Sequence, residues 1–174
     1  MGVKYKSKSG ITLETGKAAL FRGVYYPAEK VTDELCLQLG LTVDDEDYLN
    51  TVRQDKMAEI AEYDVSDNVN IFYVNGKAMW LDKATRVGLM NSTRILQESG
   101  HEQTTLWHGT TMYEVSCSRL TEILMQIEEY ALGCYNTTAR HKAVVTELNS
   151  VADIKSYDIT EGYPTKLNFK INDE

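Results

Sequence analysis

The sequence lacks the features that mark secreted, membrane-spanning and zinc-binding proteins. No apolar run approaches the roughly 18 residues that a membrane-spanning helix needs, and the basic N-terminus is not followed by the apolar segment of a secretory signal. The three cysteines, Cys36, Cys117 and Cys134, are odd in number and far apart, so they predict neither a disulfide framework nor a zinc site. We expect buried thiols in a protein made in a reducing cytoplasm.

Motifs of known catalytic or nucleotide-binding sites are also missing. The sequence contains no P-loop, no glycine-rich dinucleotide fingerprint and no G-x-S-x-G elbow. Cys117, His141 and Asn149 follow the order of a cysteine-protease triad, but no glycine-rich turn surrounds the cysteine. His101 and His108 have no carboxylate or thiol spaced to complete a metal set. We therefore expect no catalytic, cofactor-binding or metal-binding residue and no enzymatic activity.

What the sequence does contain is an uneven distribution of its net charge of −8. Residues 1–31 carry six Lys or Arg against two Glu, a net of +4, and residues 32–67 carry eleven Asp or Glu against two basic residues, a net of −9. A basic segment followed by an acidic one indicates that the protein binds charged partners. The alternatives are that the two segments neutralise each other within the fold, or that both are solvent-exposed faces. Nucleic acid is not an expected partner, because the acidic remainder repels phosphates. The candidate docking residues are Lys4, Lys6, Lys8, Lys17 and Arg22.

The first 67 residues predict a strand-rich module followed by helices. Residues 3–26 place aromatic and β-branched residues between glycines at turn-like intervals, which is typical of short strands. Thr32 is expected to cap a short helix that Gly40 ends. A longer helix is expected over residues 45–62, because its acidic start complements the helix dipole. The polar segment 61–70 follows, and we place a domain boundary within it, between residues 67 and 68.

Residues 68–174 predict a domain of two β-hairpins alternating with helices, so the fold class of the whole chain is α+β. Asn75-Gly76 supplies the two positive φ angles of a tight hairpin turn. Asp82 is expected to cap a helix that ends at Ser99. The inward side of that helix is expected to carry Ala84, Val87, Met90 and Ile95. We expect a second hairpin over 104–115, a long helix from Ser118, a short helix from Ser150 and a last strand over 166–171.

The long helix carries apolar residues at alternating steps of four and three over four heptads. This 3.5-residue repeat is typical of helices that wind around each other in oligomers. The competing interpretation is an ordinary core face, and poor helix formers near residues 133–138 also allow a break into two helices. The candidate residues of an oligomer seam are Leu120, Leu124, Ile127, Ala131, Val145 and Leu148.

Four segments in residues 68–170 carry a family resemblance: WLDKATRVGLMNSTRILQESG, TTLWHGTTMYEV, LTEILMQIEEYALGCY and KAVVTELNSVADIKSYDITEGYPTKLNF. Their order resembles an uncharacterised C-terminal domain family of tailed-phage virion, tail and fibre proteins. In that family a helix that starts at a tryptophan, a hairpin, a helix ending near a Cys-Tyr pair and a final D…GYP turn follow one another. The family has no established catalytic residues, so none is transferred to this chain.

The resemblance implies a structural protein of a phage particle, made in the bacterial host cytoplasm. We expect a head- or tail-fibre subunit or an adaptor that binds other virion proteins, such as capsid, portal, tail or fibre subunits. We also expect a homo-oligomer, a dimer or trimer, and no membrane partner. The alternative from a different class is a tail-fibre assembly chaperone that is absent from the mature virion.

Overall fold

The computed structural model describes residues 2–171 and has the expected α+β fold. The residues form two compact units, which are described separately. Unit 1 contains the residues up to Ala61 together with Arg140–Ile159, and unit 2 contains Glu62–Ala139 together with the residues from Thr160 onward. Each unit is therefore built from two separate stretches of sequence. No helix among the described residues is long and apolar enough to span a bilayer.

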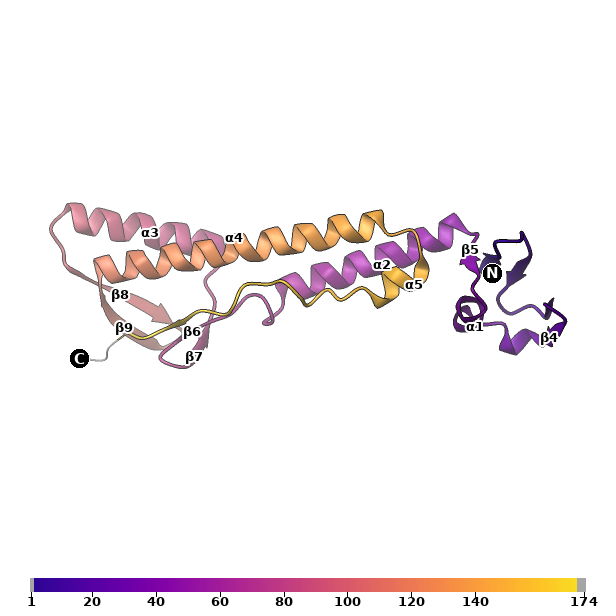
Figure 1. Ribbon diagram of the computed structural model, residues 1–174. Coiled ribbons are helices and arrows are strands. Elements are labelled where there is room, and N and C mark those ends of the chain that lie inside the picture. The colour runs from indigo at the N-terminus through magenta and orange to yellow at the C-terminus, as the bar shows by residue number, and fades with distance from the viewer. Residues whose placement is uncertain (1, 172–174) are drawn as a thin grey trace. The chain divides into compact units, whose positions relative to one another are not determined.

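Unit 1 contains small sheets and short helices, as the glycine-punctuated sequence predicts. The strand β1 lies between β2 and β5 in one antiparallel sheet, and β3 pairs with β4 in a hairpin (Figure 1). Tyr5, Leu13 and Phe21 from these strands are buried in one cluster with residues of the following helix. The elements are β1 (Lys4–Lys6), β2 (Thr12–Glu14), β3 (Ala19–Phe21), β4 (Val24–Tyr26), η1 (Ala28–Lys30), α1 (Asp33–Gln38), β5 (Thr42–Val43), the first part of α2 (Glu46–Val65), the end of α4 (Cys117–Glu147) and α5 (Val151–Ser156).

Residues 140–159 belong to unit 1 although the sequence places them far from its other residues. Two basic residues of α2 hold this segment by hydrogen bonds to backbone carbonyls. Arg53 Nη2 donates to the carbonyl of Leu148 at 2.8 Å, and Lys56 Nζ donates to the carbonyl of Tyr157 at 3.5 Å. A single boundary position in the sequence cannot separate these two units, because each unit contains two separate segments. The contacts that join those segments cannot be predicted from the neighbouring residues alone.

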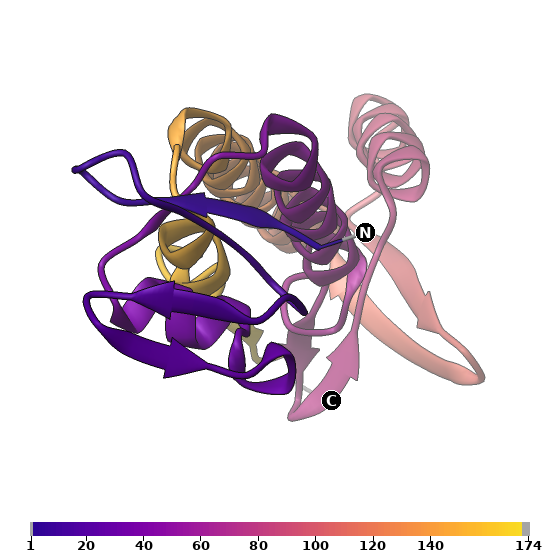
Figure 2. The same cartoon turned by 90° about the vertical axis from the view of Figure 1, so that its right-hand side faces the viewer.

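Unit 2 packs two hairpins and a closing strand beneath two helices (Figures 1 and 2). The strand β6 lies between β7 and β10, and β10 runs parallel to it. Asn75 and Gly76 have the positive φ angles, 49° and 78°, that the hairpin prediction requires. The core combines residues of both hairpins with the first part of α4. The elements are β6 (Phe72–Val74), β7 (Lys77–Met79), α3 (Lys83–Glu98), β8 (Gln103–His108), β9 (Thr111–Ser116), most of α4 and β10 (Asn168–Phe169).

The prediction of the inward side of α3 was wrong for three of its four residues, whereas the fourth, Met90, packs against the core of unit 2 as predicted. Ala84, Val87 and Ile95 are exposed, whereas the buried residues of the helix are Arg86 and Thr93. Burial of Arg86 is possible because its Nε lies 2.6 Å from Glu128 Oε2 on α4 and its Nη1 donates to the carbonyl of Leu81 at 2.6 Å. An ion pair therefore occupies the position that hydrophobicity alone assigns to an apolar residue.

The long helix α4 is continuous, so the predicted alternative of a break near residues 133–138 is also wrong. The poor helix formers in its middle make tertiary contacts. Thr137 Oγ1 donates to the carbonyl of Gly162 at 3.0 Å, and Thr138 Oγ1 donates to Asp64 Oδ1 at 2.6 Å. A methyl group placed on Gly133 would lie 2.7 Å from Cγ of Pro164. The Gly-Tyr-Pro turn is thus held against α4 because these helix positions are small or hydroxylated.

We predict that Gly133→Ala destabilises the protein by about 1–3 kcal/mol, because the new methyl group overlaps the proline ring. This loss outweighs the roughly 1 kcal/mol that alanine gains over glycine inside a helix. Gly88→Ala on α3 is the matched control, since no atom lies within 4 Å of the added methyl group, and it should stabilise by about 0.5–1 kcal/mol. Urea unfolding measures both changes, and equal shifts in the two variants would contradict the packing role of Gly133.

Candidate functional site

The predicted oligomer seam lies inside the single chain. Leu120, Leu124 and Ile127 are buried in the core of unit 2, and Val145 is fully buried in unit 1. The two other seam residues, Ala131 and Leu148, are half-buried. At these four buried positions, the apolar side of α4 is therefore part of the core of the chain itself. The 3.5-residue repeat arises because α4 packs along its length on elements of its own chain, and these side chains are not available to a second copy.

The predicted docking residues all lie at the surface of unit 1. Lys6 and Lys17 have carboxylate neighbours there: Lys6 Nζ lies 3.9 Å from Asp44, and Lys17 Nζ lies 2.8 Å from Glu14. The fold thus neutralises part of the basic segment. The other three, Lys4, Lys8 and Arg22, are exposed, and the Arg22 guanidinium carbon lies 5.0 Å from the Phe21 ring centroid.

The hairpin β3–β4 presents an apolar pair to solvent that the sequence reasoning missed. Leu20 and Tyr25 lie directly opposite each other on the two strands and are 68% and 67% exposed. Their neighbours in the strands, Phe21 and Tyr26, point into the core cluster of unit 1. We call Leu20 and Tyr25 the hairpin face. The alternation along Ala-Leu-Phe and Val-Tyr-Tyr was the available signal, because strand neighbours point to opposite sides.

Arg22 and Gly23 form the turn of this hairpin with φ angles of 51° and 81°. A positive φ is uncommon for arginine, and it is sustained here because a tight hairpin turn requires it at both central positions. The turn directly follows the strand that carries Leu20, and the Arg22 side chain packs over the ring of Phe21, which points to the other side of that strand. An exposed aromatic and a leucine beside an arginine are the residue types that carry binding energy at protein interfaces.

A partly buried phenol–carboxylate network joins four elements of unit 1. The hydroxyl groups of Tyr5 and Tyr48 donate to the two oxygens of Asp33 at 2.9 and 2.7 Å. Lys155 Nζ lies 3.8 Å from the same carboxylate and donates to the Tyr48 hydroxyl at 3.4 Å. Burial, followed by the hydrogen bond to Asp33, raises the pKa of Tyr5 far above its ordinary value and that of Tyr48 to about 12. Both phenols are therefore neutral hydrogen-bond donors at physiological pH, and their bonds to Asp33 link the elements that carry them.

An open groove of unit 1 adjoins this network. Its walls carry Tyr48 and Lys155 from the network together with Asp55, Lys56 and Glu59 of α2. Lys56 is nearly buried, and its Nζ lies 2.6 Å from Glu59 Oε2. Because each ammonium group already faces a carboxylate, the groove has no concentrated charge that would select a ligand.

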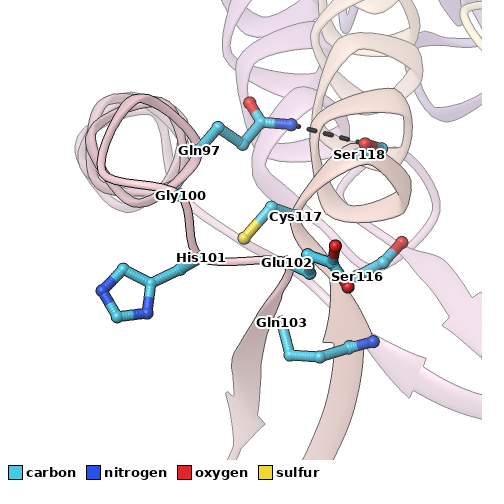
Figure 3. A pocket seen from close by; sticks show the side chains of 8 residues that line it. All are labelled: Gln97, Gly100, His101, Glu102, Gln103, Ser116, Cys117 and Ser118. Atoms are coloured by element: carbon cyan, nitrogen blue, oxygen red, sulfur yellow. Dashed lines mark hydrogen bonds between the residues drawn. The ribbon is translucent and has the colours of Figure 1, made fainter.

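A second hollow lies in unit 2 where α3, β8 and α4 meet (Figure 3). The Gln97 amide donates to the Ser118 hydroxyl at 3.5 Å, and Cys117 is buried. Figure 3 shows the imidazole of His101 pointing away from the other side chains. The His101 imidazole is therefore not directed at Cys117.

His141 cannot contact Cys117, because the two residues lie 24 positions apart on the continuous helix α4. The imidazole Nδ1 of His141 lies 2.8 Å from the hydroxyl of Tyr157. Cys36, Cys117 and Cys134 are all buried free thiols, as predicted. Among residues 2–171, no group of three His, Cys, Asp or Glu side chains is placed to hold a metal ion.

Comparison with known proteins gives no match to a family model, to a curated protein sequence or to a solved structure.

Proposed function

We propose that the protein is a non-enzymatic structural component of a tailed-phage particle, a fibre subunit or adaptor that attaches through the hairpin face of unit 1. The observation that carries the proposal is the exposed pair Leu20 and Tyr25 beside the Arg22 turn. The phage assignment rests on the resemblance of residues 68–170.

Burial of this pair offers a substantial free energy to a partner. Full burial of a leucine side chain contributes about 1.5–3 kcal/mol, and a tyrosine adds a hydroxyl that can donate at the rim of the contact. Arg22 and Lys8 carry exposed positive charge on the same unit, which attracts an acidic surface and increases the association rate. The partner surface expected from this chemistry is apolar with an acidic margin.

We predict that Leu20→Ser with Tyr25→Ser strongly reduces incorporation into phage particles while the chain stays folded. Both side chains point to solvent, so their removal changes no core contact. The loss of two interface anchors of at least 1–2 kcal/mol each lowers affinity roughly 30- to 1,000-fold. Mass spectrometry of particles assembled with the variant chain measures the copy number, and circular dichroism checks the fold.

The matched control is Leu132→Ser with Tyr135→Ser on α4, where a leucine and a tyrosine are 59% and 68% exposed. This pair has the same composition and similar exposure but lies in unit 2, so its replacement should leave incorporation unchanged. Equal incorporation of wild type and the Leu20/Tyr25 variant would overturn the role of the hairpin face. Absence of the wild-type chain from purified particles would favour the assembly chaperone instead.

Point substitutions are a sharper test than deletion of the N-terminal arm. Tyr5, Leu13 and Phe21 lie in the buried cluster with Val31 and Cys36. Removing the first 27 residues would therefore expose the remaining part of that cluster and unfold unit 1. Loss of incorporation after such a deletion would not distinguish docking from folding.

A further inference from the structure

The strand β8 has an edge without the features that usually prevent strand association. Among residues 2–171, it pairs with β9 alone, and the six residue pairs between them run without a bulge. Its residues, Gln103–His108, include no lysine, arginine, acidic residue, proline or glycine. Proteins commonly protect a free edge with charge, proline, a bulge or a covering segment. In Figure 2, the β8–β9 hairpin lies at the right-hand side of the view, below α3.

The hydrogen-bond register identifies the backbone groups that this edge presents. Cys117 N–H donates to the carbonyl of Glu102 at 2.8 Å, and these residues continue the β8–β9 register by one pair. Bonded and non-bonded pairs alternate in an antiparallel ladder. The backbone groups of Gln103, Thr105 and Trp107 therefore point away from β9. The described residues provide no hydrogen-bond partner for the N–H groups of Thr105 and Trp107.

We propose that a second copy of this chain pairs with β8 along this edge. An antiparallel pairing about a two-fold axis at Thr105 sets Thr105 opposite its equivalent and Gln103 opposite Trp107 of the second copy. All three outward residues then exchange backbone hydrogen bonds, and two hairpins become one continuous four-stranded sheet in the order β9–β8–β8–β9. Such a two-fold contact closes on itself and yields a dimer.

The charge distribution selects β8 and not β9 for this contact. No charged side chain of β8 meets a like charge across the axis. On β9 the corresponding central residue is Glu114, which lies opposite Thr105 in the hairpin. The same operation on the β9 edge would set two carboxylates directly opposite each other, which is destabilising. A strongly acidic or basic partner also finds no counter-charge on β8, so the edge suits a second copy better than a charged peptide.

The helix α3 extends the contact beyond the two strands. Figure 2 shows α3 and β8 on the same side of unit 2. Ala84, Gly88 and Ile95 lie on one face of α3, opposite the buried residues Arg86 and Thr93, and all three are exposed. A stable interface needs about 800 Å² on each partner, which a strand pair reaches only with such a second layer.

The test uses proline at the two edges of the hairpin in the full-length chain. Thr105→Pro removes an N–H group that the β8–β9 ladder does not use. We expect light scattering after size-exclusion chromatography to show a dimer for wild type and a dissociation constant raised about 10- to 100-fold for Thr105→Pro. Glu114→Pro is the matched control, because it removes the equivalent N–H group from the β9 edge. It should leave the dimer intact.

A second measurement covers the case in which a proline variant does not fold. Amide hydrogen exchange of wild type is measured at Thr105 and Trp107 over a range of protein concentrations. Both amides should become more protected as the concentration rises through the dissociation constant. A wild-type chain that is monomeric at all concentrations, or amides whose exchange does not depend on concentration, would overturn the proposal. So would dissociation by Glu114→Pro with Thr105→Pro still dimeric.

Discussion

Leu124→Lys combined with Ile127→Lys should unfold unit 2. Both side chains are buried in the cluster that joins α4 to the two hairpins. An unpaired ammonium group in an apolar interior costs several kcal/mol, even after the site relaxes. Two such groups together reach the 5–15 kcal/mol that separates most folded domains from their unfolded states. Circular dichroism and tryptophan fluorescence measure the loss directly, since Trp80 and Trp107 both lie in unit 2.

The control places the same charges on the exposed side of the same helix. Met125 and Leu132 are both exposed, so Met125→Lys with Leu132→Lys should retain the wild-type spectrum and unfolding midpoint to within about 0.5 kcal/mol per site. A folded Leu124→Lys/Ile127→Lys variant would contradict the core assignment. It would mean that these residues contact another chain in the native protein.

Asp33→Ala should destabilise unit 1 by about 2–4 kcal/mol, because two phenol hydroxyl groups lose their acceptor. Tyr5 is fully buried and cannot turn its hydroxyl toward water, so it bears the full cost of an unsatisfied donor. The carboxylate also connects α1 to β1 and α2, so its removal loosens three elements together. Urea unfolding followed by circular dichroism measures the change.

Two further substitutions separate the hydrogen bonds from the side-chain volume. Tyr48→Phe removes one bond and leaves no buried donor unpaired, so it should cost only about 1 kcal/mol. Asp33→Asn retains one carbonyl oxygen as an acceptor. Its loss of stability should therefore be larger than that of Tyr48→Phe and smaller than that of Asp33→Ala. If Asp33→Ala destabilises no more than Tyr48→Phe, the network contributes no more than one ordinary hydrogen bond.

The local signals in the sequence predicted the element boundaries well. Thr32, Asp82 and Ser150 cap their helices by accepting hydrogen bonds from backbone N–H groups three residues later, as expected of their residue types. Asn75-Gly76 forms the predicted hairpin turn. These features depend on residues close together in the chain, so a single sequence contains the required information.

The faces of the helices were predicted less well. On α3 the apolar positions Val87 and Ile95 are exposed, and Arg86 is buried against Glu128. The partner that makes this burial possible is 42 residues away in sequence. Propensity also failed in the middle of α4, where Gly133 and Thr138 contact the Gly-Tyr-Pro turn and Asp64. A residue that disfavours helix locally is retained because it fits a distant contact.

The candidate interaction surfaces also depend partly on local sequence and partly on contacts between residues far apart in the chain. Charge counting located the basic segment, but only the strand pairing brought Leu20 and Tyr25 together on one exposed face. The residues of β8 were visible in the sequence, whereas their free edge follows from the sheet order.

By itself, the sequence determined the α+β class, the turns, the caps and the approximate positions of the helices, because short-range sterics and hydrogen bonds fix these. Only the tertiary structure decided which side of α4 is core, which segments form each unit and which apolar residues stay exposed. The long apolar repeat from Leu120 to Leu148 suits a partner helix and the chain's own hairpins equally well. Burial depends on which surface is actually packed against it, and that surface is assembled from residues far apart in the chain.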